Sequence, residues 1–220
     1  MRVAALYDVH AMPWALEAVL AEVDADTVVF GGDLVAGPSP RKTLELARTV
    51  DGAIFIRGNA ERALSDWDRE HLAAEDVDWL ASLPVTATAD GVLYCHATPT
   101  DDMPATTEVT PEEVVAGLFA GTTGTVVIGH THTQFDRRVG DLRVVNAGAV
   151  GMPYEDDVAA FWLLVEDGSP SHRRTPIDVE RAVAAIRASG WPQGEEFVTE
   201  NLLTAPSRAE AIAYMESLPR

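Results

Sequence analysis

Five times in this 220-residue chain, a short apolar run rich in β-branched residues leads directly to a carboxylate, amide or imidazole side chain. The segments are Asp8-Val9-His10, Gly32-Asp33, Gly58-Asn59, Cys95-His96 and Gly129-His130-Thr131-His132. In an α/β sheet, the carboxyl ends of parallel strands meet at one edge, and sites are built there. The pattern therefore constrains the chain to an α/β fold in which seven ligand-type side chains meet at one rim: Asp8, His10, Asp33, Asn59, His96, His130 and His132.

Hydrophobic periodicity predicts how strands and helices alternate along the chain. Strands are expected at residues 2–7, 27–30, 53–56, 126–128 and 158–165, and helices at 14–23, 40–50, 60–82 in two pieces, and 110–120. Turn signals at Asp90-Gly91 and Gly140-Asp141 predict hairpins that interrupt the alternation. A four-layer αββα sandwich, with two mixed sheets flanked by helices, therefore fits the pattern better than a single doubly wound sheet.

Length and composition predict one domain over residues 1–220, with a C-terminal helical extension at about 178–220 in which Asp178 and Ser207 cap helices. The single cysteine, Cys95, excludes an internal disulfide and fits a reducing compartment. No apolar run approaches the roughly 20 residues of a membrane helix, and no signal-peptide pattern is visible. We therefore expect a cytoplasmic protein without a membrane partner.

The formal net charge of −19 bears on possible partners. A surface this acidic repels polyanions, so nucleic acid is not an expected partner. Two bound divalent cations would offset only about four of these charges, so most of the excess is surface charge. Nothing in the sequence chooses an oligomeric state.

Taken singly, most of the five segments have an ordinary structural explanation. Asp33 could cap a helix, Asn59 could occupy a turn, and His96 could be a hydrogen-bonded strand-end residue. His130 and His132, two positions apart after a buried strand, are harder to explain by packing, and imidazole is the commonest transition-metal ligand. Together, in this order, the segments predict a metal site. Oxygen and imidazole ligands without thiolate favour Mn, Fe, Zn or Ni over Ca.

Read together, these residues resemble the calcineurin-like metallophosphoesterase superfamily. Its pattern is D-x-H, then GD, then GN-[H or C]-[D or E], then a lone His, then G-H-x-H, and the resemblance covers about residues 1–165. Within the superfamily the chain looks like the small bacterial and archaeal phosphodiesterase-like members. It shares with them a helix after D-x-H and a segment like Asn146–Gly151 after G-H-x-H.

The resemblance implies a centre of two divalent transition-metal ions, with Mn favoured. One ion would take Asp8, His10, Asp33 and His132; the other would take Asp33, Asn59, His96 and His130, with Asp33 bridging. It also implies a metal-dependent phosphoesterase in which a hydroxide activated by both metals hydrolyses a small phosphodiester or a phosphoanhydride like a dinucleoside polyphosphate. Asp33, Asn59, His96 and His130 are the expected catalytic residues.

One position departs from the family pattern. Many members carry a His after the Asn, where it serves as general acid or steadies the phosphate, but this chain has Ala60. Losing general-acid help commonly costs about 10²–10⁴-fold when the leaving group needs a proton. We therefore expect a preference for phosphoanhydrides and aryl diesters over alkyl monoesters.

Two neighbouring side chains carry further expectations. Glu61 matches the acidic position of the motif and is expected to orient a ligand His, or else to be an exposed carboxylate at a helix start. Arg57 is expected either to contact phosphate or to pair with a nearby carboxylate.

Two other functions remain open from the sequence. A nuclease would handle nucleic acid along a positive track, and the acidic chain has no basic run. A scaffold is the second alternative, because the retromer complex contains a protein of this fold used for partner binding. A scaffold predicts eroded ligand positions, whereas all seven ligand-type residues are present here.

Overall fold

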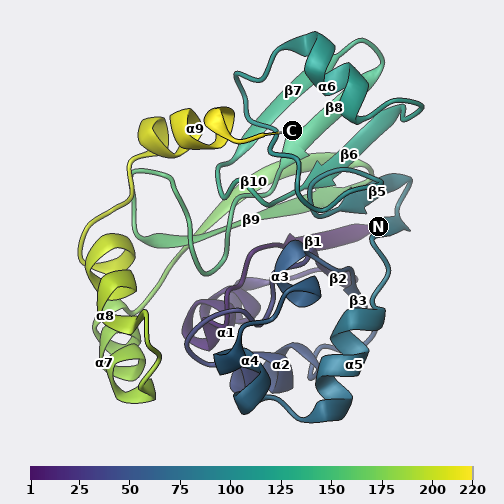
Figure 1. Ribbon diagram of the computed structural model, residues 1–220. Coiled ribbons are helices and arrows are strands. Elements are labelled where there is room, and N and C mark those ends of the chain that lie inside the picture. The colour runs from purple at the N-terminus through teal and green to yellow at the C-terminus, as the bar shows by residue number, and fades with distance from the viewer. Residues whose placement is uncertain (220) are drawn as a thin grey trace.

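Two five-stranded β-sheets pack against each other in the computed structural model, which describes residues 1–219 (Figure 1). The first sheet has the order β10-β9-β1-β2-β3 and the second β4-β5-β6-β8-β7. The strands are β1 (Arg2–Leu6), β2 (Thr27–Phe30), β3 (Ile54–Phe55), β4 (Thr86–Ala89), β5 (Val92–Cys95), β6 (Gly124–Ile128), β7 (Phe135–Val139), β8 (Leu142–Asn146), β9 (Ala159–Glu166) and β10 (Ser169–Pro176).

The first sheet is built around β1. This strand runs parallel to β2 and antiparallel to β9, so that Val3 lies opposite Thr27 on one side and Val165 on the other. Residues Val3–Leu6 are fully buried, because helices cover one face of the strand and the second sheet covers the other. Strands β1, β2 and β3 are parallel, and their carboxyl ends therefore reach the same edge.

The second sheet combines parallel strands with two hairpins. β5, β6 and β8 run parallel, while β4 and β7 pair antiparallel with β5 and β8. The β4–β5 turn contains Asp90 and Gly91 with φ of 51° and 74°, a pair of left-handed residues that suits a two-residue hairpin. Both hairpins predicted from the sequence, at 90–91 and at 140–141, are confirmed.

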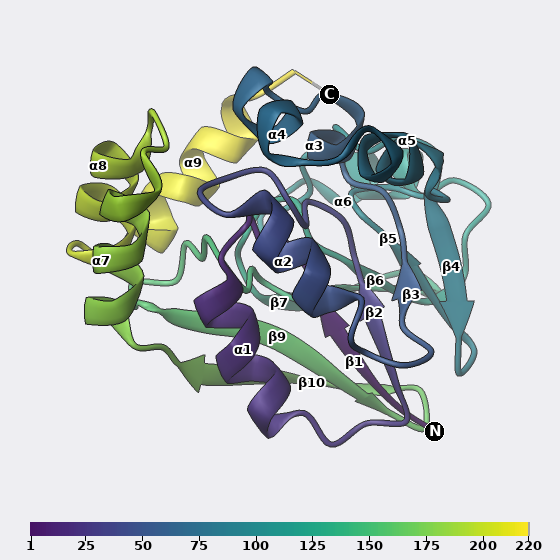
Figure 2. The ribbon, with the colours of Figure 1, turned by 90° about the horizontal axis from the view of Figure 1, so that it is seen from below.

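Helices cover the outer faces of the two sheets (Figures 1 and 2). They are α1 (Pro13–Glu22), α2 (Pro40–Ala47), α3 (Asn59–Arg62), α4 (Asp66–His71), α5 (Ala74–Ser82), α6 (Glu112–Leu118), α7 (Val179–Ser189), α8 (Gly194–Phe197), the π-helix η1 (Val198–Leu202) and α9 (Arg208–Ser217). Figure 1 shows α6 above the second sheet, on the opposite side from α1, α2 and α5.

Alternate residues of β1 belong to different cores, as the period of a strand requires. Ala4 and Leu6 join the cluster under α1 and α2, whereas Val3 and Ala5 join the cluster between the sheets. A third cluster lies between the second sheet and α6, where Val115 meets Val126. These three interfaces confirm the expected αββα sandwich.

The helix boundaries differ from the sequence prediction in three places. Residues 60–82 form three helices rather than two, because Ser65 starts α4 by accepting a hydrogen bond from the Asp68 N–H, and the extended Leu72 ends it. The helix that begins at Pro40 ends at Ala47, three residues before the predicted Val50. The helix predicted from Thr110 begins at Glu112.

The C-terminal residues form α7, α8, η1 and α9. Asp178 caps α7 by accepting from the Arg181 N–H, and Ser207 caps α9 by accepting from the Glu210 N–H, as predicted. Helix α7 buries an apolar face against the core, whereas α9 buries none of its residues. Among residues 1–219, no helix is both long and apolar enough to cross a membrane.

Candidate metal centre

The seven ligand-type residues lie at the ends of five strands drawn from both sheets. Asp8 and His10 follow β1, Asp33 follows β2, and Asn59 follows β3 and opens α3. From the second sheet, His96 follows β5 directly, and β6 leads into the loop of His130 and His132. All seven lie at the rim where these strands end.

One group of these side chains forms around Asp8. The Nε2 of His132 lies 3.3 Å from the Asp8 Oδ1, and the Nε2 of His10 lies 4.0 Å from the same oxygen. The Nε2 atoms of His10 and His132 are 3.1 Å apart. Asp8, His10 and His132 thus present three possible ligand atoms within 4.8 Å of one another.

A second group forms on the other side of Asp8. The Nε2 of His96 lies 3.6 Å from the Asp33 Oδ1, 3.9 Å from the Asp8 Oδ1 and 3.0 Å from the Asn59 Oδ1. The rings of His96 and His130 are 5.1 Å apart, which brings His130 to this group. Asp8 belongs to both groups, and Asp33 connects them because its Oδ2 lies 3.8 Å from the His10 Nε2.

The arrangement fits a cation better than it fits a hydrogen-bond network. The Asp8 Oδ1 and the His132 Nδ1 are buried and form no hydrogen bond with any residue that the structure describes. A buried polar atom without a partner costs about 1–3 kcal/mol, more when it is charged. Two imidazole Nε2 atoms facing one another beside this oxygen form a donor set that a divalent transition metal would satisfy.

Backbone carbonyls orient three of the imidazoles. The Nδ1 of His96 lies 3.0 Å from the Gly31 oxygen, and the Nδ1 of His10 lies 3.2 Å from the Ala36 oxygen. For both rings, a proton on Nδ1 leaves the Nε2 lone pair facing the site. His130 is turned the other way, with Nε2 2.9 Å from the Met103 oxygen.

The backbone of the rim is strained at the candidate ligands themselves. Positive φ angles occur at Asp8 (52°), His10 (47°), Asp33 (52°), His130 (68°) and His132 (58°). Such angles are uncommon outside glycine and cluster at functional sites. Hydrogen bonds between neighbouring loops, such as Asp8 N–H to the Gly32 oxygen (3.1 Å), hold this conformation. The fold therefore prepares the ligand positions before any ion binds.

Two glycines of the motifs allow the rim loops to approach closely. A Cβ on Gly58 would lie 2.2 Å from the Asp33 Oδ1, and a Cβ on Gly129 would lie 2.5 Å from the Asp8 Oδ2. Both distances are far below any real contact, so a side chain at either position would displace a carboxylate.

Glu61 does not contact a ligand imidazole, so that expectation is wrong. It is almost fully buried, and its carboxylate accepts three backbone hydrogen bonds, from the N–H groups of Asp33 (2.8 Å), Leu34 (2.7 Å) and Gly58 (2.9 Å). Three such bonds satisfy a buried carboxylate that would otherwise be costly. Glu61 therefore fixes the Asp33 loop against the Asn59 loop.

Sequence reasoning assigned no role to Asn146, which supports the last ligand loop. Its side chain is fully buried and donates to the Gly129 oxygen (2.7 Å) and the Thr131 Oγ1 (3.0 Å), while its own oxygen accepts from the Gly148 N–H (2.9 Å). The signal in the sequence was an amide at the end of the apolar run Val144-Val145, where an unpaired polar group would be expensive.

The charges of the site act on one another. Burial lowers the pKa of His10 and of His130, which favours the neutral imidazole that binds metals. Burial opposes a charge on His96 too, but the Asp33 and Asp8 carboxylates outweigh it and raise its pKa. For Asp8, burial opposes ionisation, yet the surrounding imidazoles hold its pKa below the usual range.

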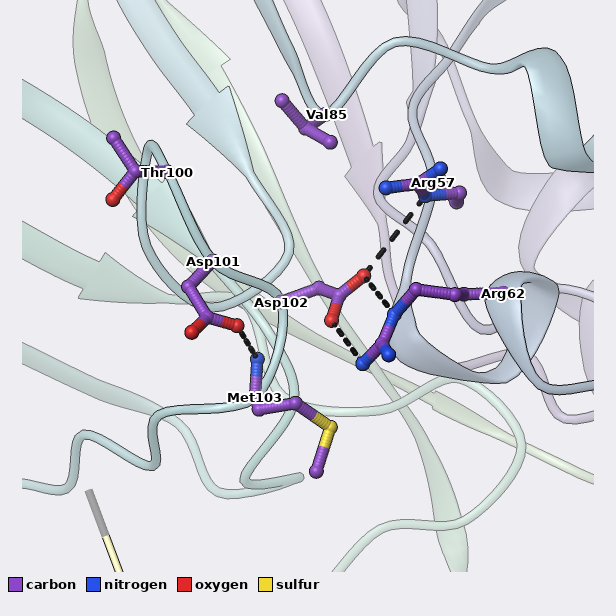
Figure 3. A pocket seen from close by; sticks show the side chains of 7 residues that line it. All are labelled: Arg57, Arg62, Val85, Thr100, Asp101, Asp102 and Met103. Carbon is purple, nitrogen blue, oxygen red and sulfur yellow. Dashed lines mark hydrogen bonds and ion pairs between the residues drawn. The ribbon is translucent and has the colours of Figure 1, made fainter.

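A pocket of about 360 Å³, here named the arginine pocket, adjoins the His130 side of the centre, and its charged lining is Arg57, Arg62, Asp101 and Asp102 (Figure 3). Figure 3 shows Arg57 and Arg62 converging on Asp102. Arg62 binds the buried Asp102 through two hydrogen bonds of 2.8 and 3.2 Å, while the Arg57 Nε lies 3.9 Å from the same carboxylate. The Arg57 Nε is buried and forms no hydrogen bond with the described residues. The expected carboxylate partner of Arg57 is thus present at long range.

A known family matches most of the chain. The family described as the calcineurin-like phosphoesterase superfamily domain matches residues 1–168. No curated protein matches the chain.

Several solved structures share the fold. A metallophosphoesterase from Sphaerobacter thermophilus is 28% identical, with a TM-score of 0.78, over 93% of this chain and 100% of that one. A hypothetical protein from Pyrococcus horikoshii OT3 is 17% identical, with a TM-score of 0.74, over 90% and 97% of the two chains. A candidate diadenosine tetraphosphatase is 18% identical, with a TM-score of 0.55, over 79% and 93%.

Proposed function

The chain belongs to the calcineurin-like phosphoesterase superfamily, and from that premise we propose that it is a binuclear metal-dependent hydrolase of small phosphodiesters or phosphoanhydrides. Dinucleoside polyphosphates are the substrate class that we favour. The proposed ligands are Asp8, His10, Asp33, Asn59, His96, His130 and His132, with Mn²⁺ as the favoured ion, and the proposed location is the cytoplasm.

The observation that carries the proposal is the buried Asp8 oxygen. It lies within 4.0 Å of the Nε2 atoms of His10, His96 and His132 and has no hydrogen-bond partner among residues 1–219. A structural role would pair this oxygen with a donor. A role as metal ligand leaves it free to bind a cation, which supports the assignment.

The chemistry that divalent ions supply at such a centre is Lewis acidity at the phosphoryl oxygens and a nucleophilic water near neutral pH. The chain's own residues prepare the site for it. Glu61 holds the loops of Asp33 and Asn59 in register, and backbone carbonyls fix the rings of His10 and His96. Preorganised groups of this kind need no rearrangement when charge develops on the phosphate.

One side chain of the arginine pocket, Arg57, supports a substrate with more than one phosphate. Arg62 is neutralised by Asp102, whereas the Arg57 Nε lies 3.9 Å from that carboxylate and forms no hydrogen bond with the described residues. Arg57 immediately precedes Gly58-Asn59, so its guanidinium would meet a phosphate adjacent to the one at the metals. The fold shared with a candidate diadenosine tetraphosphatase agrees with this substrate class.

Ala60 bears on the leaving group. Its N–H donates to the Asp33 Oδ1 (2.8 Å), which places a methyl group where many family members carry a histidine. A methyl group cannot protonate a leaving oxygen, so the enzyme would favour leaving groups that depart as stable anions. Phosphoanhydrides and aryl diesters meet that condition, and alkyl monoesters do not.

Hydrolysis of a substrate panel with added Mn²⁺ tests the function. The panel contains an aryl phosphodiester, an aryl monoester, an alkyl monoester, diadenosine tetraphosphate and a cyclic nucleotide. We expect turnover of the diester or the anhydride, loss of that turnover in His130→Ala, and a selective gain on the alkyl ester in Ala60→His.

The matched control is His172→Ala, because His172 is exposed on β10, its side chain hydrogen-bonds to the Asn146 carbonyl oxygen (2.9 Å), and it belongs to neither ligand group. It should retain wild-type turnover. A lack of turnover with Mn²⁺, Fe²⁺, Zn²⁺ and Ni²⁺ alike, despite tightly bound ions, would reject the enzymatic proposal in favour of a scaffold.

A further inference from the structure

A second pocket, of about 250 Å³, opens on the His132 side of the centre and is built largely by the C-terminal helices. Tyr154 joins it to the metal centre, because its ring stacks on the His132 ring at 5.0 Å and its N–H donates to the His132 oxygen (3.1 Å). The remaining surface of Tyr154 lines the pocket. This pocket therefore begins one aromatic ring away from the proposed ligands, on the side away from Arg57 and Arg62.

Aromatic groups shape the pocket. Helix α7 ends at Gly190, with φ of 76°, and the turn presents the half-buried Trp191. Phe197 packs edge-on against Trp191 at 5.5 Å and fixes its ring. Three aromatic side chains, Tyr154, Trp191 and Phe197, thus line this pocket. Flat π-systems bind in such cavities by stacking.

The polar groups of the pocket are acceptors and amides, without a cation. They are Gln193, Glu196, Glu200 and Asn201. The carboxylates of Glu196 and Glu200 form no hydrogen bond or ion pair with the residues that the structure describes, and the Asn201 side-chain amide donates to the Phe197 oxygen, at 3.4 Å. Asn201 and Glu200 stand on the π-helix η1, an irregular turn of a kind that occurs frequently at functional sites.

We propose that this pocket binds an amino-bearing nucleobase, such as adenine, of a nucleotide substrate. The base would stack on Trp191 and Tyr154, and its exocyclic amino group would donate to Glu196 or Glu200. The role of this pocket as a substrate subsite rests on the proposed function. The binding itself depends only on these residues.

The charge of the pocket selects this ligand. Two carboxylates without a neighbouring cation repel phosphate, which the arginine pocket and the metals would take instead. The exocyclic amino group of adenine can donate a hydrogen bond to these carboxylates. A base with a carbonyl oxygen at that position presents an acceptor to an acceptor, which is unfavourable. A quaternary ammonium group is the competing ligand, because aromatic rings and carboxylates also bind cations.

Titration calorimetry of the chelator-treated protein with adenosine, uridine and choline tests the proposal. We expect adenosine to bind at least about fivefold more tightly than uridine. Trp191→Leu should weaken adenosine binding by at least about fivefold, since base stacking on an aromatic ring is worth roughly 1–3 kcal/mol. Glu196→Gln and Glu200→Gln should narrow the preference for adenosine over uridine.

The matched control is Glu195→Gln. Glu195 precedes Glu196 in the same short helix, but it pairs with Arg187 (2.6 and 2.8 Å) and does not line the pocket, so adenosine affinity should not change. Binding of choline but not adenosine would overturn the proposal. The proposal would also be overturned if adenosine did not bind, or if it bound Trp191→Leu as tightly as the wild type. Adenosine binding that depends on Trp191, in a protein that hydrolyses nothing in the panel, would uphold the pocket and reject the proposed function.

Discussion

At the scale of single residues, Gly129 shows how little space separates the two sheets at the rim. A methyl group there would meet both the Asp8 carboxylate and the Tyr7 ring at 2.5 Å. We expect Gly129→Ala to weaken Mn²⁺ binding about 10–100-fold, the range for residues that position ligands, and to cost roughly 1–3 kcal/mol of stability through overpacking. Calorimetric Mn²⁺ titration and urea unfolding measure the two effects.

Gly117→Ala is the control for that substitution. Gly117 lies on the exposed side of α6, and a Cβ there would meet nothing within 4 Å. Replacing glycine by alanine inside a helix should raise stability by roughly 0.5–1 kcal/mol and leave Mn²⁺ binding unchanged. Mn²⁺ affinity in Gly129→Ala equal to that of the wild type would contradict the assignment of Asp8 as a ligand.

Two fully buried tyrosines of the core between the sheets offer a matched comparison. The Tyr7 hydroxyl donates to the Val127 oxygen at 3.0 Å, whereas the Tyr94 hydroxyl is buried without a partner among the described residues. Tyr7→Phe should therefore cost about 1 kcal/mol, and Tyr94→Phe should be neutral or stabilising. Chemical denaturation compares them. Equal destabilisation by both variants would show that the Tyr94 hydroxyl is hydrogen-bonded in solution.

Cys95 provides a prediction about pH. Its thiol is fully buried at the end of β5, and burial raises its pKa. The unfolded thiol titrates near pH 8.5, so the folded form keeps a proton that the unfolded form loses, and stability should fall as pH rises above about 8.5. Unfolding in urea at pH 8 and pH 10 should show this fall, with a smaller fall in Cys95→Ala. Rapid reaction of the native thiol with a disulfide reagent at pH 8 would contradict the burial.

The sequence indicated which side chains would lie together at the rim, because each one follows an apolar strand, where a polar side chain is conspicuous. Their supports were harder to predict. The Glu61 carboxylate binds backbone N–H groups, and because all residues except proline have one, no residue type identifies its partners. Arg62 and Asp102 lie 40 positions apart, and only the folded loops bring them together.

At the scale of elements, α9 is the helix that depends most on polar contacts. It buries none of its residues. At the start of the helix, the Arg208 guanidinium binds Glu155, Glu108 (2.9 Å) and the Gln134 oxygen (2.7 Å). Near its end, the Glu216 carboxylate accepts a hydrogen bond from the Thr107 hydroxyl (2.7 Å). The pair of Arg208 with Glu108 is partly exposed, and such pairs contribute little stability, while the α7 face is packed in the core. We expect α9 amides to exchange with deuterium well before those of α7.

The variant that tests this assignment is Arg208→Met, which keeps the length of the side chain and removes its charge. It should speed exchange throughout α9 and leave α7 unchanged, because the two helices open independently. Equal protection of α7 and α9 in the wild type would show that α9 has an apolar anchor.

Elements also differed in how far the sequence determined them. The hairpins followed from local turn residues, such as Asp90-Gly91, and were correct. The break between α3 and α4 depends on Ser65, the N-cap of α4, which was not distinguished within the helical pattern of residues 60–82. The order of strands in the sheets could not be predicted from local sequence patterns, because β1 pairs with β9 through residues more than 150 positions apart.

At the scale of the whole molecule, removal of metal should lower stability. The chain carries a net charge of −19, and the Asp8 and Asp33 carboxylates sit close together at the rim. Mn²⁺ at about 100 times its Kd would add about 2.7 kcal/mol for each bound ion, so one ion alone would raise Tm by roughly 5–10 °C in a chain of this size. Thermal unfolding with chelator or with Mn²⁺ measures this.

Two controls test whether this Tm shift comes from the proposed centre: a different ion, and a variant that lacks one proposed metal ligand. Ca²⁺ should shift Tm less, since imidazole ligands suit it poorly, and His132→Ala should reduce the shift with Mn²⁺. The same Tm shift in His132→Ala as in the wild type would place the stabilising ion elsewhere on the acidic surface.

The position of β1 in the middle of its sheet has a consequence for the newly made chain. Among the strands that the structure describes, this one is synthesised first, yet one of its two neighbours, β9, ends at Glu166. While the ribosome makes the intervening residues, one edge of the apolar segment Val3–Leu6 has no strand to pair with, and an unpaired edge of this kind favours aggregation. All seven proposed ligands emerge before β9 does. Native assembly of the first sheet must therefore await the synthesis of β9, and β1, although made early, is among the last strands to gain both neighbours.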